Sequence, residues 1–131
     1  MPPTIYTYQV EASSYRVTAK RYDAKKGAPE LRGIKLFGLK QILTGGPALH
    51  LNLTSAVKIS FADRKLRRFG EFNLEGTINA NAVLSDFEDM YRIVHLEKPV
   101  YFLWTEVEAG ITGDTEMRRI DSYELRAVRK P

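Results

Sequence analysis

Hydrophobic and polar residues alternate along much of this chain, which is the pattern of half-buried β-strands. From Leu49 to Phe61 the apolar positions are the odd ones, namely Leu49, Leu51, Leu53, Val57, Ile59 and Phe61. From Leu66 to Ile78 they are the even ones, namely Leu66, Phe72, Leu74 and Ile78. A short polar segment joins the two runs, so the pattern predicts a long central β-hairpin. Strands of about thirteen residues would span roughly 43 Å, and strands of that length must coil.

The segment from Thr4 to Tyr22 also has the pattern of a strand, but its apolar parity changes at Ser13-Ser14. A side-chain period of two allows such a change only at a bulge or a tight turn. The segment is therefore either one long bulged strand or a hairpin. The apolar segment from Gly33 to Leu43 predicts a further strand.

One segment has helical periodicity, over about residues 82–97. Its apolar residues are spaced at i, i+3, i+4 and i+7, namely Phe87, Met90, Tyr91 and Val94. Ser85 and Glu88 have the spacing of a capping box, and Pro99 ends the helix. The run Val100–Trp104 is apolar on both faces, which predicts a central strand. A last strand, from Glu116 to Val128, is expected to pair back onto it.

These elements predict a mainly β fold in a single globular domain, residues 1–131. We expect an antiparallel β-barrel or strongly coiled sheet, with a long central hairpin and one helix before the last two strands. The alternative is an α+β fold, in which the helix packs on one face of an open antiparallel sheet.

Composition narrows the chemistry. The chain has no cysteine, which excludes disulfides, thiolate zinc sites and thiol catalysis. The N-terminus shows no signal peptide, and no apolar run approaches the ~20 residues that span a bilayer. We therefore expect a soluble, cytoplasmic protein without a membrane partner.

Charge is unevenly distributed along the chain. Residues 1–70 hold 13 Lys/Arg and 4 Asp/Glu, whereas residues 71–131 hold 7 and 12. The first part carries a net charge of +9 and the second −5. Such asymmetry is typical of a polyanion-binding surface, but it equally suits two parts of one fold, or two protomers, that attract each other.

No motif for catalysis or cofactor binding emerges. His50 and His95 lie in different elements, and zinc ligands come as closely spaced pairs with further ligands. Gly33 to Lys40 has the glycine spacing of a P-loop but lacks its Lys and Ser/Thr. Glu106 and Glu108 share one strand face, where solvated carboxylates are the favoured interpretation. We expect no catalytic residues, no metal and no cofactor, and the sequence favours a protein that is not an enzyme.

A candidate nucleic-acid site combines basic and aromatic residues, because cations neutralise phosphates and exposed aromatics stack on unpaired bases. It consists of the predicted hairpin tip and the first strand region, with Arg64, Lys65, Arg67, Arg68, Arg16, Lys20, Arg21, Tyr15 and Tyr22. The order of a helix followed by two strands resembles an oligonucleotide-binding (OB) barrel in architecture alone.

Three functions are therefore expected from the sequence. The first is self-association or partner binding by a homo-oligomeric structural protein, on the base rate of symmetric oligomers. The alternative is an OB-like module for single-stranded nucleic acid. The second alternative is a barrel that holds a small molecule in a pocket lined by Trp104, Phe102, Tyr101 and Phe87.

Overall fold

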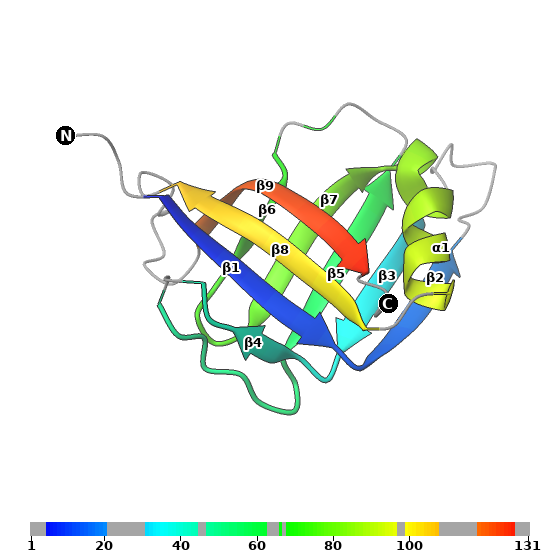
Figure 1. The fold of residues 1–131 in the computed structure, drawn as a ribbon. Helices are drawn as coiled ribbons and strands as arrows, with labels where there is room; N and C mark the ends of the chain where they lie inside the picture. Colours follow the sequence, from blue (N-terminus) through cyan, green and yellow to red (C-terminus); the bar gives the residue numbers. More distant parts are fainter. Residues whose placement is uncertain are drawn as a thin grey trace.

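The computed structural model describes residues 5–20, 31–44, 47–62, 66, 68–96, 99–107 and 118–127. These residues form nine strands and one α-helix, which a short 3-10 turn precedes (Figure 1). The elements are β1 (Ile5–Ala12), β2 (Ser14–Lys20), β3 (Leu31–Phe37), β4 (Lys40–Ile42), β5 (Ala56–Ala62), β6 (Gly70–Phe72), β7 (Thr77–Val83), η2 (Leu84–Asp86), α1 (Phe87–Leu96), β8 (Val100–Val107) and β9 (Arg118–Ala127).

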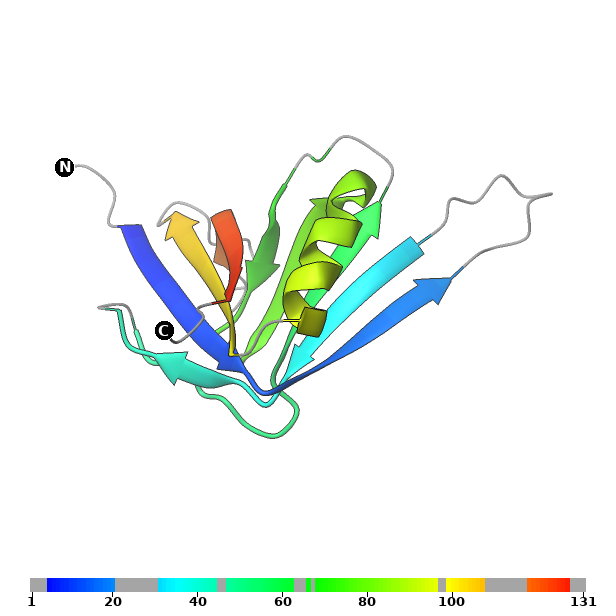
Figure 2. The same ribbon diagram turned by 45° about the vertical axis from the view of Figure 1, so that its right-hand side comes forward.

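The strands form one mixed sheet in the order β2-β3-β5-β7-β6-β9-β8-β1-β4. The sheet curls into a half-barrel whose two walls open like a V, and α1 stands between them (Figure 2). The mainly β, strongly coiled fold is confirmed, and so is the helix before the last two strands. The sheet has nine strands, whereas an OB barrel has five.

The two walls are joined by a long bent hairpin. β1 continues into β2 through Ser13 alone, and β3 continues into β4 through Gly38 and Leu39. β1 pairs with β4 and β2 pairs with β3, both antiparallel. The parity change at Ser13-Ser14 therefore marks a bend in one long strand, and β1 does not pair with β2. Gly38 has φ of +62°, and a Cβ there would overlap the Ser13 side chain, so the bend requires glycine.

The predicted central hairpin, Leu49–Phe61 with Leu66–Ile78, is wrong. Within the first of these two segments the strand begins only at Ala56, and Leu53 is fully exposed in a turn in which Ser55 N donates to Asn52 O. β6 is three residues long because the chain reverses at Asn73–Gly76, where Thr77 N donates to Asn73 Oδ1 at 3.0 Å. β7 then lies between β6 and β5 and pairs with β5 in parallel.

The helix is shorter than predicted. Residues 82 and 83 belong to β7, where they pair with Phe61 and Ala62 of β5. The 3-10 turn η2 follows, and α1 begins at Phe87. Ser85 lies inside η2, whose N-cap residue Val83 forms no side-chain cap, so the predicted capping box is absent at this helix start. The apolar stripe is confirmed, since Phe87 and Val94 are buried.

The core fills the inner face of the half-barrel. Trp104 stacks on Tyr8 at 5.3 Å and meets the edge of Phe72 at the same centroid distance. All three side chains are at most 1% exposed. β8 lies between β9 and β1, so the prediction of a central strand at Val100–Trp104 is confirmed.

Candidate nucleic-acid interface

The structure separates the residues of the predicted nucleic-acid site. Arg16 is exposed on β2, whereas Tyr15 faces the core side and its hydroxyl lies 2.9 Å from His95 Nδ1 of α1. Arg68 is exposed just before β6, on the far side of β5 and β7 from Arg16. The remaining predicted positions lie outside the described residues, or have side chains that do, namely Arg64, Lys65, Arg67, Lys20, Arg21 and Tyr22.

Three cations on neighbouring strands form a row across the outer face of the sheet, which is the face turned away from the core. Arg16 of β2 is opposite Lys35 of β3, and Lys35 is opposite Lys58 of β5. Directly opposite residues have Cβ atoms about 5 Å apart, and like-charged side chains in such pairs are destabilising. Among the described residues no carboxylate pairs with any of the three cations. We call Arg16, Lys35 and Lys58 the basic row.

An aromatic ring accompanies the basic row. Phe37 is two residues beyond Lys35 on β3, and its half-buried ring lies on the same face. The Lys35 Nζ is 4.8 Å from the ring centroid and the Arg16 Cζ is 5.4 Å from it. These cation–π contacts hold both charged ends over the sheet surface rather than away from it. Phe37, Lys35 and Lys58 could not be assigned to this site from the sequence, because their proximity to Arg16 depends on strand register.

The next row of the outer face is made of small, polar residues. Thr18, Gly33, Ser60 and Asn81 are opposite one another on β2, β3, β5 and β7. None of these side chains is charged, and Gly33 has none beyond hydrogen. The sheet surface beside the basic row is therefore low and able to form hydrogen bonds.

A polar cavity lies next to the basic row, on the side of Lys58. Lys58 is opposite Asn79 of β7, which is opposite Glu71 of β6, which is opposite Arg119 of β9. These last three residues line a cavity of about 150 Å³ together with Arg68, Gly70 and Asn81. Gly70 has φ of +142°, and a Cβ there would overlap the Asn79 carbonyl oxygen. Glycine is therefore required where β6 approaches β7 at the cavity floor.

Tyr123 supports the cavity from the inner side of the sheet. Its hydroxyl donates a hydrogen bond of 2.7 Å to the carbonyl oxygen of Asn81. Burial, together with the nearby Asp86 carboxylate, raises the pKa of Tyr123 to about 12. The phenol therefore remains a donor throughout the physiological pH range.

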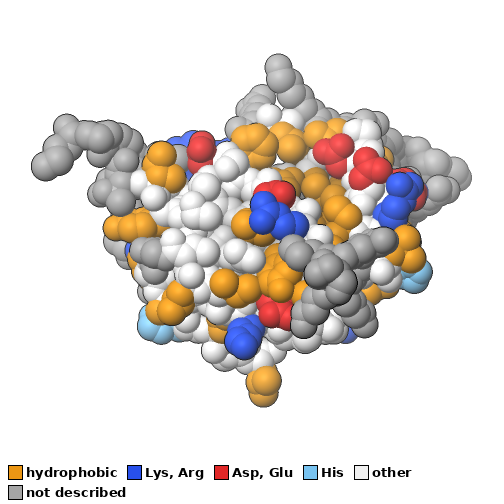
Figure 3. Space-filling view, viewed as in Figure 1, with side chains coloured by type: hydrophobic (Ala, Val, Ile, Leu, Met, Phe, Trp, Pro, Cys, Tyr) orange, Lys and Arg blue, Asp and Glu red, His pale blue; other side chains and the backbone are white. Residues whose placement is uncertain are grey.

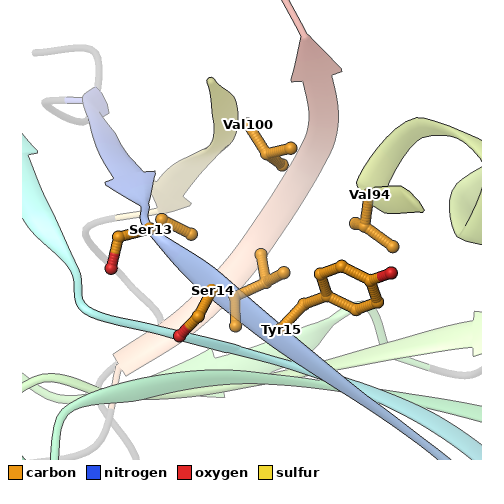
Figure 4. A pocket seen from close by; sticks show the side chains of 7 residues that line it. Ser13, Ser14, Tyr15, Val94 and Val100 are labelled. Carbon is orange, nitrogen blue, oxygen red and sulfur yellow. The ribbon is translucent and has the colours of Figure 1, made fainter. Parts of the chain in front are cut away.

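Two other cavities differ from this one. One of about 160 Å³ at the ends of β5 and β7 is lined by Arg32, Ser60, Phe61, Ala62, Leu66, Asn81 and Ala82. The other, about 20 Å³, lies at the bend after Ala12, where the Tyr15 ring approaches Val94 of α1 (Figure 4). A space of that size holds one water molecule at most.

The residues predicted to line a small-molecule pocket do not share one face. Phe102 and Trp104 are buried on the inner face of β8 with their rings 5.7 Å apart, and Tyr101, directly before Phe102 in sequence, is on the opposite face. Phe87 packs edge-on against Phe61 at 5.1 Å, under the helix.

A buried ion pair occupies the place where solvated carboxylates were expected. Glu106 is 3% exposed, and its Oε2 accepts a hydrogen bond of 2.7 Å from Tyr8. Arg118 Nη1 donates to both carboxylate oxygens, at 3.0 and 3.2 Å. The solvated interpretation of Glu106 is therefore wrong, and Glu108 lies outside the described residues. With both of its oxygens accepting hydrogen bonds and its side chain buried, Glu106 is best explained, together with Arg118, as part of the core.

The outer face of the other wall has a different character. Over β1 and β8 the surface is mostly uncharged (Figure 3). On β9 the exposed pair Arg126 and Glu124 is joined at 2.9 Å, so these charges neutralise each other. The unpaired cations of the basic row have no counterpart there among the described residues.

The described residues include neither a metal-binding cluster nor a membrane-spanning helix. They contain no group of three or more His, Asp or Glu side chains arranged to hold a metal ion. No helix in this part of the chain has the length and hydrophobicity needed to cross a membrane.

No family model, curated protein or solved structure matches the chain. The assignment of a function therefore rests on the geometry of the described residues.

Proposed function

We propose that this protein binds single-stranded nucleic acid across the outer face of β2, β3 and β5. The observation that carries the proposal is the basic row, in which Arg16, Lys35 and Lys58 stand opposite one another. Like charges placed directly opposite one another across paired strands cost free energy through their repulsion, and a polyanion removes that cost. The excess positive charge of residues 1–70 agrees with this assignment.

The surroundings of the basic row favour a single strand. A base can stack on an aromatic ring or on a guanidinium plane, and Phe37 and Arg16 provide one of each. The neighbouring row of Thr18, Gly33, Ser60 and Asn81 leaves room for a chain to lie flat and offers hydrogen-bond groups to sugars and bases.

The test is binding of a fluorescein-labelled U12 RNA and a dT12 DNA, followed by fluorescence anisotropy at about 50 mM salt. Arg16→Glu with Lys58→Glu should weaken binding at least tenfold, because two attractive charges become repulsive. The matched control is Lys40→Glu with Arg92→Glu, which changes net charge equally at exposed positions on β4 and α1.

The expected result is a loss confined to the basic-row variant. Absence of binding by the native protein at low salt would overturn the proposal. An equal loss in the control variant would also overturn it, because binding would then follow net charge and not the row.

Self-association is the second candidate function, and one observation favours it. β4 is the last strand of the sheet, so one of its edges has no strand neighbour among the described residues, and Leu43 directly after it is 74% exposed. An open edge beside an apolar side chain is a common site of pairing with a second copy. Light scattering over a hundredfold concentration range tests this candidate. A dimer that Leu43→Lys dissociates supports it, and a monomer at every concentration eliminates it.

A further inference from the structure

The cavity at the end of the basic row differs chemically from the row itself. The row is cationic, but the cavity between β6, β7 and β9 combines two guanidinium groups, two amides and one carboxylate. Among the described residues no ion pair joins Glu71 to Arg68 or Arg119. The charged groups of the cavity are therefore not neutralised by one another at contact distance.

The carboxylate of Glu71 determines which chemical class of ligand the cavity can bind. An ionised Glu71 accepts hydrogen bonds and donates none, so it repels a phosphate and needs a partner with donor groups. A ribose offers isolated hydroxyl donors. Bases carry N–H donors, and in guanine two of them lie side by side, which matches the two oxygens of a carboxylate. The cavity, at about 150 Å³, is smaller than the ~300 Å³ at which sites for drug-sized ligands begin. A single ring system suits it better than a whole nucleotide.

The combination of residue types then distinguishes among the bases. Guanine presents two donors, N1–H and N2–H₂, on one edge, and two acceptors, O6 and N7, on another. A carboxylate matches the first edge and an arginine matches the second. Adenine lacks the paired donors, and uracil lacks an amino group. Glu71 and Arg119 are opposite each other on β6 and β9, so their side chains stand side by side on one face and both can reach a single ligand.

We infer that this cavity binds one guanine base of the strand that lies along the basic row. Glu71 accepts hydrogen bonds from N1–H and N2–H₂, and Arg119 donates to O6 and N7. Asn79 connects the cavity to the basic row, because it is directly opposite Lys58. Asn81 donates through Nδ2 to the carbonyl oxygen of Arg68 at 3.3 Å, which holds the arginine backbone at the rim.

This inference rests on the proposed function for delivery of the strand, and the two can fail separately. The experiment compares U12 RNA with three versions that carry one central G, A or C. The native protein should bind the G version about tenfold more tightly than U12, and the A and C versions within threefold of U12.

The decisive variant is Glu71→Gln, which keeps the shape of the side chain but removes the charge. It should abolish the preference for G while leaving U12 affinity within threefold. The matched control is Glu75→Gln, an equal charge change at an exposed position in the turn before β7, which should keep the preference. Circular dichroism establishes that both variants remain folded.

Each outcome has a distinct meaning. Binding of U12 without a preference for G overturns the inference and leaves the proposed function standing. An equal preference for A and G also overturns it, because the cavity would then select purines by size. If no oligonucleotide binds, the proposed function fails, and a titration with guanosine and adenosine monophosphates tests the cavity alone. A guanosine-specific chemical-shift change that Glu71→Gln removes would support the inference, and its absence would overturn it.

Discussion

The hydroxyl of Tyr8 donates a hydrogen bond of 2.7 Å to the buried carboxylate of Glu106. The two residues lie on neighbouring strands, β1 and β8, and Arg118 of β9 completes the group by binding both carboxylate oxygens. Three adjacent strands are thus joined by side chains on the inner face of the wall. A buried charge is tolerated only where all its partners are present, which makes the group sensitive to the loss of any member.

Arg118→Ala should therefore destabilise the protein strongly. It leaves the Glu106 carboxylate buried with Tyr8 as its one remaining partner among the described residues. Loss of one member of a fully buried pair costs about 3–5 kcal/mol, and because the Arg118 side chain is 23% exposed, a loss of about 3 kcal/mol is expected. The control is Arg126→Ala on the same strand, which breaks the exposed pair with Glu124 and should cost about 0–1 kcal/mol. Urea unfolding of both variants measures the difference, and equal losses would contradict the structural role of the pair.

Stability should fall at alkaline pH because of Tyr8. Burial, followed by the hydrogen bond to Glu106 and the repulsion from its charge, raises the pKa of this phenol above its ordinary value of 10. A group whose folded pKa is raised contributes stability that is present below the unfolded pKa. That stability is lost as pH rises above about 10, at up to about 1.4 kcal/mol per pH unit.

The measurement compares native protein with Tyr8→Phe by urea unfolding at pH 8, 10 and 11. Tyr8→Phe should be less stable at pH 8 by about 1–2 kcal/mol, because the buried Glu106 loses a hydrogen bond. The gap should narrow above pH 10. A gap that stays constant would show that the phenol titrates alike in the folded and unfolded chain.

Much of the fold could be predicted from local patterns. The predictions that failed depend on which strands pair, and a local pattern does not contain that information. The alternation at Val57, Ile59 and Phe61 correctly gives a strand with one buried face, since all three are at most 1% exposed. Alternation is identical for parallel and antiparallel partners, so it could not show that β5 pairs with β7 in parallel. The chain reverses at the turn Asn73–Gly76, and this reversal places β7 beside β5. The apolar residues that flank the turn are at even positions, so the alternation pattern does not reveal the turn.

Of the candidate interface, only Arg16 could be assigned from the sequence, because the other members depend on strand pairing. Arg16 was identified because it lies in a basic, aromatic segment of the sequence. Lys35 and Lys58 were not, because each is one cation within an ordinary strand until register places them opposite Arg16. Tyr15 was assigned to the same site, but adjacent residues of a strand point to opposite faces, which places it under α1. Glu106 has no local signal at all, because its burial depends on Arg118.

Gly38→Ala should destabilise the bend between the two walls. A non-glycine residue at φ of +62° costs about 1–2 kcal/mol, and the new methyl group would also overlap the Ser13 hydroxyl. The control is Gly33→Ala, where a Cβ would lie 3.5 Å from Ile59 O in ordinary contact, and a change within about 1 kcal/mol is expected. Addition of Ser13→Ala to Gly38→Ala should recover the steric part of the loss. No recovery would assign the whole cost to the backbone.

The salt dependence of binding should report the three cations one by one. For single strands the logarithm of the binding constant falls with the logarithm of salt concentration with a slope of about −0.7 per phosphate neutralised. If each of the three cations of the basic row neutralises one phosphate, the slope of this plot should be about −2. Lys35→Ala should reduce its magnitude by about 0.7, whereas Lys40→Ala on β4 should leave it unchanged. Equal slopes for both variants would remove Lys35 from the interface.

Phe37 should contribute to affinity without contributing to that slope. Phe37→Leu keeps an apolar side chain at a half-buried position, so the sheet should remain folded, but it removes the ring on which a base stacks. Loss of one base–aromatic stack costs about 1–3 kcal/mol, which is roughly five- to 160-fold in affinity. The salt slope should stay the same, because no phosphate contact is lost. If the slope fell together with affinity, Phe37 would act by holding Arg16 and Lys35 in place, and the ring would not itself contact the nucleic acid.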